Sequence, residues 1–261
     1  MRLHAGCKFS FETNQPTAAT FMLRPRSGEG QWIVSEEYIT EPNVPVTEYT
    51  DGYGNLCQRL VVPEGSFSLY TSVVTETADV IDVAMDAPFI PVENLPSEAL
   101  HFLLPSRYCQ SDLMGFLAGQ IVEGLPLGYA QVEAIRSWIF NNLTYCYGTS
   151  SSATSAVETA ETHTGVCRDF AHLGIALCRS LNIPARMVVG YLYELKPMDL
   201  HAWFEAFVGD QWYTIDPTQA APKGNRIAIA YGRDAADVAF VTQFGVLNLL
   251  EMDVWVNLAP A

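Results

Sequence analysis

The segment of residues 200–218, LHAWFEAFVGDQWYTIDPT, constrains the fold of this chain more than any other. Gly209 and Asp210 tolerate the positive φ angles that a two-residue hairpin turn requires. Apolar residues flank the turn on both sides, so we expect two antiparallel strands whose register the turn determines. The segment therefore predicts a β-hairpin late in the chain.

Counting outward from this turn places a histidine beside an aspartate. If Val208 pairs with Gln211, then Trp203 lies opposite Asp216. His201 is two residues from Trp203, so its side chain shares a face with Asp216 and is its diagonal neighbour. Diagonal residues lie about 7 to 8 Å apart, within reach of a His–Asp hydrogen bond that would orient the imidazole. The alternative is an ordinary strand histidine with a chance acidic neighbour.

A second constraint is a helix that we expect to begin after a Thr164 cap and to end at Asn182, because Pro184 prevents its continuation. Apolar residues recur in it at intervals of three and four residues. Cys167 would lie in the first turn, where free amides and the helix dipole stabilise a thiolate by about 0.3 to 2 kcal/mol. That effect alone is too small for strong activation, which needs a nearby imidazolium such as that of His201.

The same helix also carries Cys178 and His172, which raises the alternative of a metal site. At a rise of 1.5 Å per residue, Cys167 and Cys178 would stand about 16 Å apart, whereas zinc ligands lie about 2 Å from the metal. His172 would point about 140° away from Cys167 around the helix. We therefore expect no metal, and we interpret Cys178 as a core residue and His172 as a surface or structural one.

The charge balance narrows the possible partners. Asp and Glu number 29 against 14 Lys and Arg, a formal net charge of −15. Binding to nucleic acid or to an anionic membrane needs a basic surface, so we expect neither. No run of about 18 apolar residues suggests a membrane span, and the start lacks the apolar stretch of a secretory signal. The 6 cysteines show no paired spacing, which favours free thiols in the cytoplasm.

Two regions of different pattern divide the 261 residues. Residues 1–90 contain short Val-, Thr- and Ile-rich segments separated by turn residues, which predicts an antiparallel β domain of sandwich type. Residues 91–261 contain helical patterns followed by strands, including RIAIAYG and EMDVWVNL near the C-terminus. The chain is thus predicted to be α+β, with these C-terminal strands in the second domain.

Two further helices are expected in the second domain. One covers residues 111–124 and would bury Leu113 and Phe116 with Leu117 and Ile121, and the other covers residues 129–145. Residues 148–165 are rich in Ser, Thr and Ala and poor in large apolar side chains, so we expect mostly loop there.

These motifs resemble a known family. GVCRDFAHLGIALCRSLNIPARMVVGY and the hairpin segment closely resemble the transglutaminase-like superfamily, in its bacterial branch of candidate cysteine proteases. The resemblance implies a papain-like fold and a triad made of a cysteine that starts a helix, a histidine in H-A-W-x-E and an aspartate in D-P-T. Here these are Cys167, His201 and Asp216. MRLHAGCKFSFE, EYTDGYGNLCQRL and GRDAADVA also resemble that branch, so the resemblance covers nearly the whole chain.

One segment departs from the pattern of this branch. GRDAADVA there usually runs into a proline and a short Arg-Gly turn, but here the chain reads AFVTQFG. If that loop borders the cleft, we expect it to change the choice of substrate. The chain also lacks the additional β domains and calcium-site sequences of animal transglutaminases, so the resemblance implies neither calcium activation nor another cofactor.

The predicted activity is thiol-dependent acyl transfer on peptide or protein amide bonds. Cys167 would attack the carbonyl, His201 would protonate the leaving amine and Asp216 would orient His201. We expect hydrolysis rather than crosslinking, although both proceed through the same acyl-enzyme. A true protein transglutaminase and a catalytically idle peptide-binding module are the alternatives, and a complete triad argues against the idle module.

An enzyme of this kind also needs donors for the oxyanion. The Cys167 backbone amide would supply one. Three aromatic residues are candidates for the second donor or for the cleft wall, with plain aromatic packing as the alternative for each. They are Trp203, Tyr145 and Tyr147.

Overall fold

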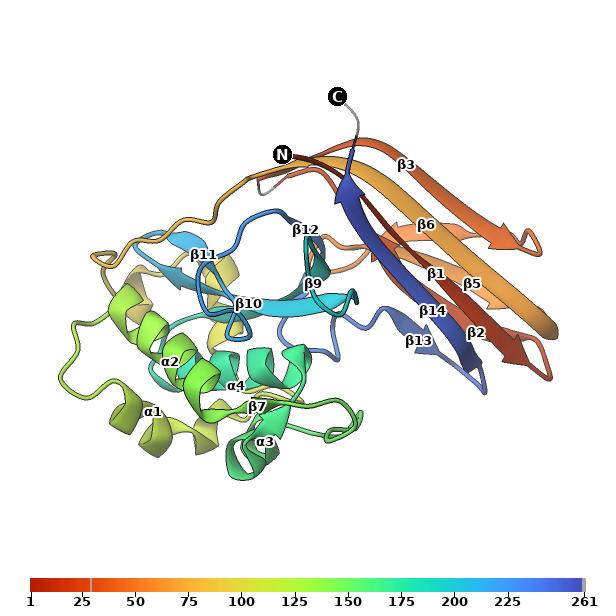
Figure 1. Ribbon diagram of the computed structural model, residues 1–261. Coiled ribbons are helices and arrows are strands. Elements are labelled where there is room, and N and C mark those ends of the chain that lie inside the picture. The colour runs from red at the N-terminus through yellow and green to blue at the C-terminus, as the bar shows by residue number, and fades with distance from the viewer. Residues whose placement is uncertain (29, 260–261) are drawn as a thin grey trace.

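A computed structural model describes residues 1–28 and 30–259. Within this range the chain forms an α+β fold with three four-stranded sheets, as predicted (Figure 1). Two of the sheets form a β-sandwich. The third sheet packs against the helices, and we call this sheet and the helices together the core. No helix among the described residues is long and apolar enough to cross a membrane.

The sandwich confirms the antiparallel β-structure expected for the first part of the chain. Its sheets have the strand orders β14–β1–β6–β3 and β13–β2–β5–β4. Phenylalanines of both sheets meet between them: the ring of Phe21 lies 5.9 Å from that of Phe11 and 6.4 Å from that of Phe67. The strands are β1 (Arg2–Thr13), β2 (Thr17–Arg24), β3 (Gln31–Glu41), β4 (Thr47–Thr50), β5 (Leu56–Val62), β6 (Gly65–Thr77), β13 (Val241–Gln243) and β14 (Asn248–Leu258).

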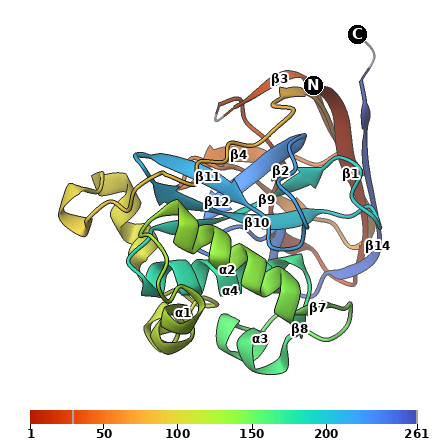
Figure 2. The same cartoon turned by 60° about the vertical axis from the view of Figure 1, so that its left-hand side comes forward.

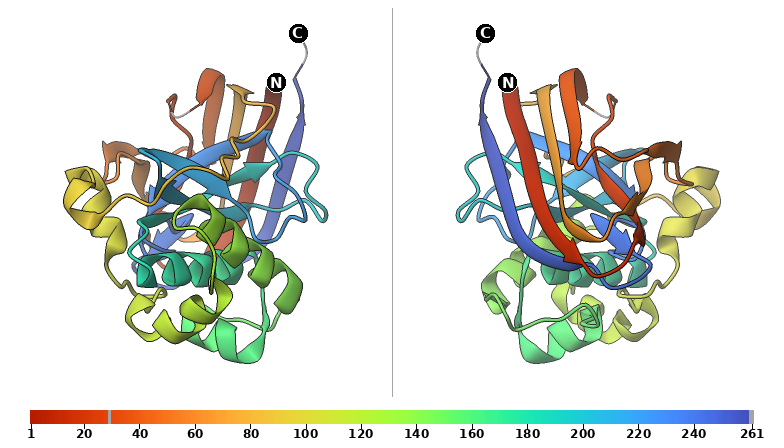
Figure 3. Two further views of the ribbon diagram at one scale, coloured as in Figure 1. Left: turned by 90° about the vertical axis from the view of Figure 1, so that its left-hand side faces the viewer. Right: turned by 90° about the vertical axis from the view of Figure 1, so that its right-hand side faces the viewer.

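The C-terminal segment EMDVWVNL, which the sequence assigned to the second domain, lies in β14 of the sandwich, and an additional short strand, β13, precedes it. β14 pairs with β1, with Val256 opposite Ala5, and β13 pairs with β2, with Val241 opposite Phe21. Both views of Figure 3 accordingly show β1 beginning and β14 ending at one corner of the molecule. β14 covers the edge of β1, which would otherwise expose unpaired amides and carbonyls. The sandwich therefore contains strands from both ends of the chain. The chain passes between the sandwich and the third sheet twice, and the predicted boundary near residue 90 marks only the first of these passages.

The third sheet has the order β11–β10–β9–β12 and supports the helices on one face (Figure 2). Helix α4 packs against β10 and β9, while β12 contacts β2 and β6 of the sandwich. The strands are β9 (Ala185–Leu192), β10 (His201–Val208), β11 (Gln211–Ile215) and β12 (Arg226–Gly232). The helices are α1 (Gly115–Ile121), α2 (Tyr129–Asn142), α3 (Ala156–Thr162) and α4 (Cys167–Ser180), with 3-10 turns at Val92–Asn94, Ser97–Leu103 and Ser111–Leu113 and a short parallel pair of β7 (Thr144–Tyr145) and β8 (Thr164–Gly165).

The first predicted helix exists as α1, and its predicted apolar face is correct in part, because Leu117 and Ile121 are partly buried and pack against the core. Phe116 is 81% exposed and Leu113 is also exposed, whereas Met114, Ala118 and Val122 are buried. A 3-10 turn precedes α1, and its tighter winding shifts the phase of the residues that follow.

Two other expectations about local structure were also wrong. Helix α3 lies in the segment expected to be loop, and the Glu158 side chain accepts a hydrogen bond from the Ser155 backbone amide at 2.8 Å, as in a capping box. Thr164 belongs to β8, so the residue that caps α4 is Val166 instead, whose backbone amide donates to the Asp169 carboxylate at 2.9 Å. The predicted end is confirmed, since Asn182 follows α4 with φ 60°.

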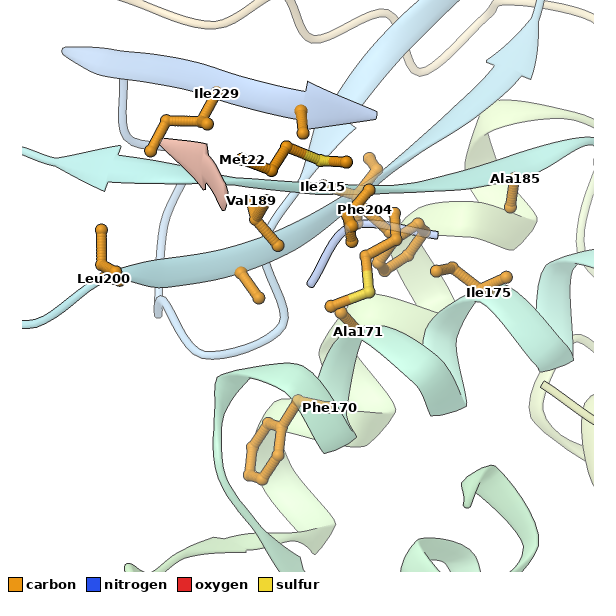
Figure 4. Packing of buried hydrophobic residues seen from close by; sticks show 14 of the residues in the cluster. Met22, Phe170, Ala171, Ile175, Ala185, Val189, Leu200, Phe204, Ile215 and Ile229 are labelled. Carbon is orange, nitrogen blue, oxygen red and sulfur yellow. The ribbon is translucent and has the colours of Figure 1, made fainter. Parts of the chain in front are cut away.

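The contact between α4 and β10 organises the core beneath the site. Figure 4 shows Ala171 and Ile175 of α4 facing Phe204 of β10. Gly174 lies between them in sequence, and a Cβ atom there would overlap the Phe204 ring. Because Phe204 is fully buried, its ring has no space into which to move.

We expect Gly174→Ala to lower the free energy of unfolding by about 1 to 3 kcal/mol, because overpacking outweighs the better helix propensity of alanine. The matched control is Gly119→Ala in α1, where an added Cβ atom would point into open space. That change should stabilise by about 0.5 to 1 kcal/mol. Urea unfolding of both variants measures the difference, and equal effects would contradict close packing of α4 on β10.

Candidate active site

The hairpin register predicted from the sequence is confirmed. Val208 pairs with Gln211 and Glu205 with Thr214. This pairing brings His201, the first residue of β10, to Asp216, which directly follows β11. The imidazole Nε2 lies 2.8 Å from the carboxylate Oδ2, and both side chains are buried. The diagonal pair expected from strand counting is therefore a hydrogen-bonded pair in the structure.

Helix α4 begins with the cysteine that lies beside this pair. Cys167 is its first residue and is half-buried. The Asp169 carboxylate accepts a hydrogen bond from the Val166 backbone amide and so caps the start of the helix. It also accepts a hydrogen bond from Arg168 Nη2 at 2.7 Å. Unpaired amides of the first turn and the positive end of the helix dipole therefore face the region of the thiol.

Two cavities of about 300 Å³ each meet at His201. We call one the apolar pocket: it is lined by Cys167 as well as His201, and most of its other walls are aliphatic or aromatic. We call the other the tyrosine pocket, because Tyr145 and Tyr147 line it together with Phe170. Of the three residues predicted from the sequence, Cys167 and His201 thus line these clefts, and Asp216 lies behind His201.

His201 has an unusual electrostatic environment. Burial on its own lowers the histidine pKa, but the charge and hydrogen bond of Asp216, together with a hydrogen bond to Cys167, raise that pKa to about 9. Since Nε2 contacts Asp216, Nδ1 is the ring nitrogen left to face the Cys167 thiol. The imidazole therefore holds a proton at neutral pH next to the sulfur.

Asp216 is held as a carboxylate by three neighbours. Burial on its own would raise the carboxyl pKa, but the charges of Arg226 and His201 and the hydrogen bonds from His201 and Thr218 keep that pKa well below its usual range. The Thr218 amide and hydroxyl donate to Oδ1 at 3.0 and 2.7 Å. The aspartate is therefore charged and fixed in orientation.

Arg226 is the residue of this site that sequence analysis missed. Its Nη2 donates to Asp216 Oδ2 at 2.8 Å, so it shares that oxygen with His201. Its guanidinium also lies 4.9 Å from the centre of the Trp203 ring, a cation–π contact. The available signal was an arginine at the start of an otherwise apolar strand, but no pattern along the chain connects it with Asp216.

The three aromatic candidates occupy different places. Trp203 is buried, stacks on His201 at 6.1 Å between ring centres, and lines a separate cavity rather than the apolar or the tyrosine pocket. It therefore packs against the His201 ring, which agrees with the alternative of aromatic packing and not with a place in the wall of these two pockets. Tyr145 and Tyr147 do line the cleft. The Tyr145 hydroxyl also lies near the backbone of Cys167.

The other cysteines differ from Cys167 in exposure. All 6 are unpaired, as the sequence predicted. Cys146 is exposed, whereas burial raises the pKa of Cys7 and of Cys109 to about 12 and that of Cys178 still further. The interpretation of Cys178 as a core residue is thereby confirmed.

His172 is a structural residue and does not lie on the surface. It is fully buried, its ring stacks on Tyr108 at 5.0 Å, and Nε2 accepts a hydrogen bond from the Ala235 amide at 3.1 Å. Burial lowers its pKa to about 3, so it stays neutral. Across residues 1–28 and 30–259, no group of three or more His, Cys, Asp or Glu side chains is placed to hold a metal ion.

Comparison with known proteins identifies relatives along the whole chain. The Transglutaminase-like superfamily model matches residues 116–217, which include all three residues of the predicted triad. The crystal structure of a candidate cysteine protease from Cytophaga hutchinsonii is 37% identical, covers 100% of this chain and 91% of its own, and superimposes with a TM-score of 0.93.

Two further relatives are more distant. An uncharacterized protein of Mycobacterium tuberculosis is 30% identical over 254 residues, which are 83% of this chain and 77% of that protein. A protein-glutamine gamma-glutamyltransferase of Pseudomonas aeruginosa is 31% identical over 125 residues, only 41% of this chain and 19% of that protein. With these matches and this fold, the chain belongs to the transglutaminase-like superfamily.

Proposed function

We propose that this protein is a thiol-dependent acyl-transfer enzyme that acts on amide bonds of peptides or proteins. The observation that carries the proposal is the buried hydrogen bond between His201 and Asp216 at the start of α4, where Cys167 lies. An aspartate–histidine pair fixes the tautomer of the imidazole, and an imidazole beside a cysteine can take the thiol proton and so generate the nucleophile.

The proposed reaction needs only groups of this chain, the substrate and water. The Cys167 thiolate attacks the amide carbonyl and forms a C–S bond. The Nδ1 proton of the His201 imidazolium passes to the amide nitrogen as the C–N bond breaks, and the amine leaves. Neutral His201 then takes a proton from water, whose oxygen attacks the thioester, and the collapse of that intermediate returns the thiolate and the imidazolium.

The charges around His201 support this cycle. Asp216 stabilises the imidazolium, while Arg226 permanently balances the carboxylate and so limits how strongly His201 holds its proton. For the oxyanion we propose the Cys167 amide and the Tyr145 hydroxyl, since Tyr145 lines the cleft with His201 and lies near the backbone of Cys167.

We propose water as the usual acceptor of the acyl group. The relative that matches over the full chain with 37% identity is a candidate cysteine protease, whereas the gamma-glutamyltransferase matches over only 41% of this chain. Transfer to an amine is the second candidate, because an amine and water attack the same thioester. A catalytically idle peptide-binding module is disfavoured by the complete set of thiol, imidazole and carboxylate.

A direct test uses a library of peptide amides with and without added primary amines. We expect wild-type protein to release the amine from a subset of peptides and Cys167→Ala to release none. Mass spectrometry separates the free acid from an amide formed with the added amine. Absence of both products across the library, with selective peptide binding retained, would support the idle module instead.

The thiols should differ in reactivity at pH 6. We expect iodoacetamide to modify Cys167 first, because the neighbouring imidazolium favours its thiolate. Cys146 serves as an internal control, because it is more exposed and lines neither the apolar nor the tyrosine pocket. Peptide mapping over a time course measures both rates, and faster modification of Cys146 would show that the site assignment is wrong.

The shared carboxylate predicts opposite pH effects for two substitutions. Because the His201 pKa is raised, the imidazolium persists at neutral pH, and amide hydrolysis should decline as the pH rises through about 9. Asp216→Asn should move this decline to lower pH and reduce the rate about 10²- to 10⁴-fold. Arg226→Gln removes a cation near His201, so it should move the decline to higher pH. Rate profiles between pH 5 and 11 measure both shifts.

Controls separate these effects from misfolding. Removing the Asp216 charge leaves the Arg226 cation buried without its partner, which costs about 3 to 5 kcal/mol, so circular dichroism must accompany each profile. Arg226→Lys should restore most of the wild-type profile, and Asp210→Asn, in the hairpin turn, should leave it unchanged. Shifts in the same direction for Asp216→Asn and Arg226→Gln would refute the charge balance.

A further inference from the structure

The apolar pocket has a composition that suits one kind of substrate side chain. Its floor is formed by Met187 and Val189 of β9 with Ala202 of β10, on the face of the sheet that also packs against α4. Val238 and Phe240 form a wall that comes from the segment following β12. A volume of about 300 Å³ is at the small end for ligand pockets, which suits one side chain rather than a long stretch of peptide.

Few charged groups reach this pocket. Besides His201, the charged residue that lines it is Arg168. Its Nη2 donates to Asp169 Oδ1 and to the Ser151 carbonyl, each at 2.7 Å, so its guanidinium already has partners. A charged substrate side chain would lose its hydration here without gaining a counter-ion, whereas an apolar one would gain from burial.

The wall of the apolar pocket is held in place by the β-sandwich. The Phe240 carbonyl accepts a hydrogen bond from the Met22 amide at 3.0 Å, and β13 then pairs with β2 immediately after it. At the other end of the segment, Asp234 accepts a hydrogen bond from the Tyr108 amide at 2.7 Å. Both ends are therefore anchored, and the pocket has a preformed shape.

The chemistry decides which part of the substrate enters the apolar pocket. After the attack, the acyl carbon is bonded to Cys167 Sγ, while the amine leaves beside His201, which protonates it. The apolar pocket is lined by both Cys167 and His201, whereas the tyrosine pocket is lined by His201 without Cys167. The acyl residue therefore belongs in the apolar pocket and the leaving group in the tyrosine pocket.

We propose that the apolar pocket is the acyl-side specificity site and that it selects substrates whose attacked carbonyl belongs to a residue with a large apolar side chain. This inference rests on the proposed function and assigns its substrate class. It makes the segment around Phe240 a specificity-determining wall, held by the sandwich. A glutamine side chain, by contrast, would bury an amide in a mainly aliphatic pocket, where the Tyr108 hydroxyl and the Arg168 guanidinium are already engaged in hydrogen bonds.

The test uses peptidyl chloromethyl ketones that differ only in the residue next to the reactive group: Phe, Leu, Gln, Asp or Lys. The thiolate bonds to the methylene carbon and chloride leaves, so the rate of Cys167 modification reports how well each side chain fits. We expect the Phe and Leu reagents to react about ten- to hundred-fold faster than the Gln, Asp and Lys reagents. Iodoacetamide, which lacks a side chain, gives the reference rate for each variant.

Variants at the wall test the pocket itself. Phe240→Ala should slow the Phe and Leu reagents about ten-fold while leaving the iodoacetamide rate unchanged. Phe240→Lys should speed the Asp reagent relative to the Phe reagent, a gain that misfolding cannot produce. The matched control is Phe244→Ala, on the same segment but 71% exposed and outside the pocket, which should change nothing.

The outcomes separate the two proposals. If iodoacetamide does not prefer Cys167 over Cys146, the proposed function fails. If Cys167 reacts selectively but the Gln, Asp or Lys reagent matches the Phe and Leu reagents, the apolar specificity site is refuted and the function stands. The specificity site is also refuted if the Phe240 variants leave the order of reagents unchanged.

Discussion

One carboxylate oxygen, Asp216 Oδ2, connects the chemistry of this protein with its fold. It accepts hydrogen bonds from His201 on β10 and from Arg226 on β12, and β9 lies between these two strands. A buried carboxylate is stable in the charged form only when neighbouring charges and hydrogen bonds replace its water. Here Arg226 supplies a permanent charge and His201 a titratable one. The same atom therefore orients His201, balances the charge of Arg226, and links β12 to the residue that follows β11.

The β-sandwich contributes to the site through the return of the chain. After β12 the chain leaves the core sheet, lines the cleft with Phe240, and enters the sandwich as β13 and β14. A wall of this kind, attached to the core at Asp234 and to β2 at Met22, keeps its shape without a substrate. The sandwich therefore has a structural role at the candidate site, because it holds one side of the cleft in place beside the Cys167 thiol.

The parts of the site that follow from local sequence rules could be predicted, whereas the contacts between segments far apart in the sequence could not. The Gly209–Asp210 turn sets the hairpin register, and that register alone predicts the His201–Asp216 pair. The capping box of Ser155 was likewise present in the sequence, although the loop-like composition around it concealed α3. By contrast, the pairing of β14 with β1 and the approach of Arg226 to Asp216 join segments with no shared periodicity. Long-range pairing of this kind leaves no mark in a single sequence.

The arginine changes how Asp216 must be understood. From sequence alone the role expected of Asp216 was to orient His201 at the site, whereas a buried carboxylate can also stabilise the core. The structure shows a charge that does both, because it neutralises a guanidinium that is itself buried against Trp203. The same coupling has a chemical use. A lone aspartate would hold the imidazolium more strongly, and the shared cation weakens that hold and so eases the release of the proton to a leaving amine. The interaction that fastens β12 into the core thus also moderates the acidity of the proposed proton donor.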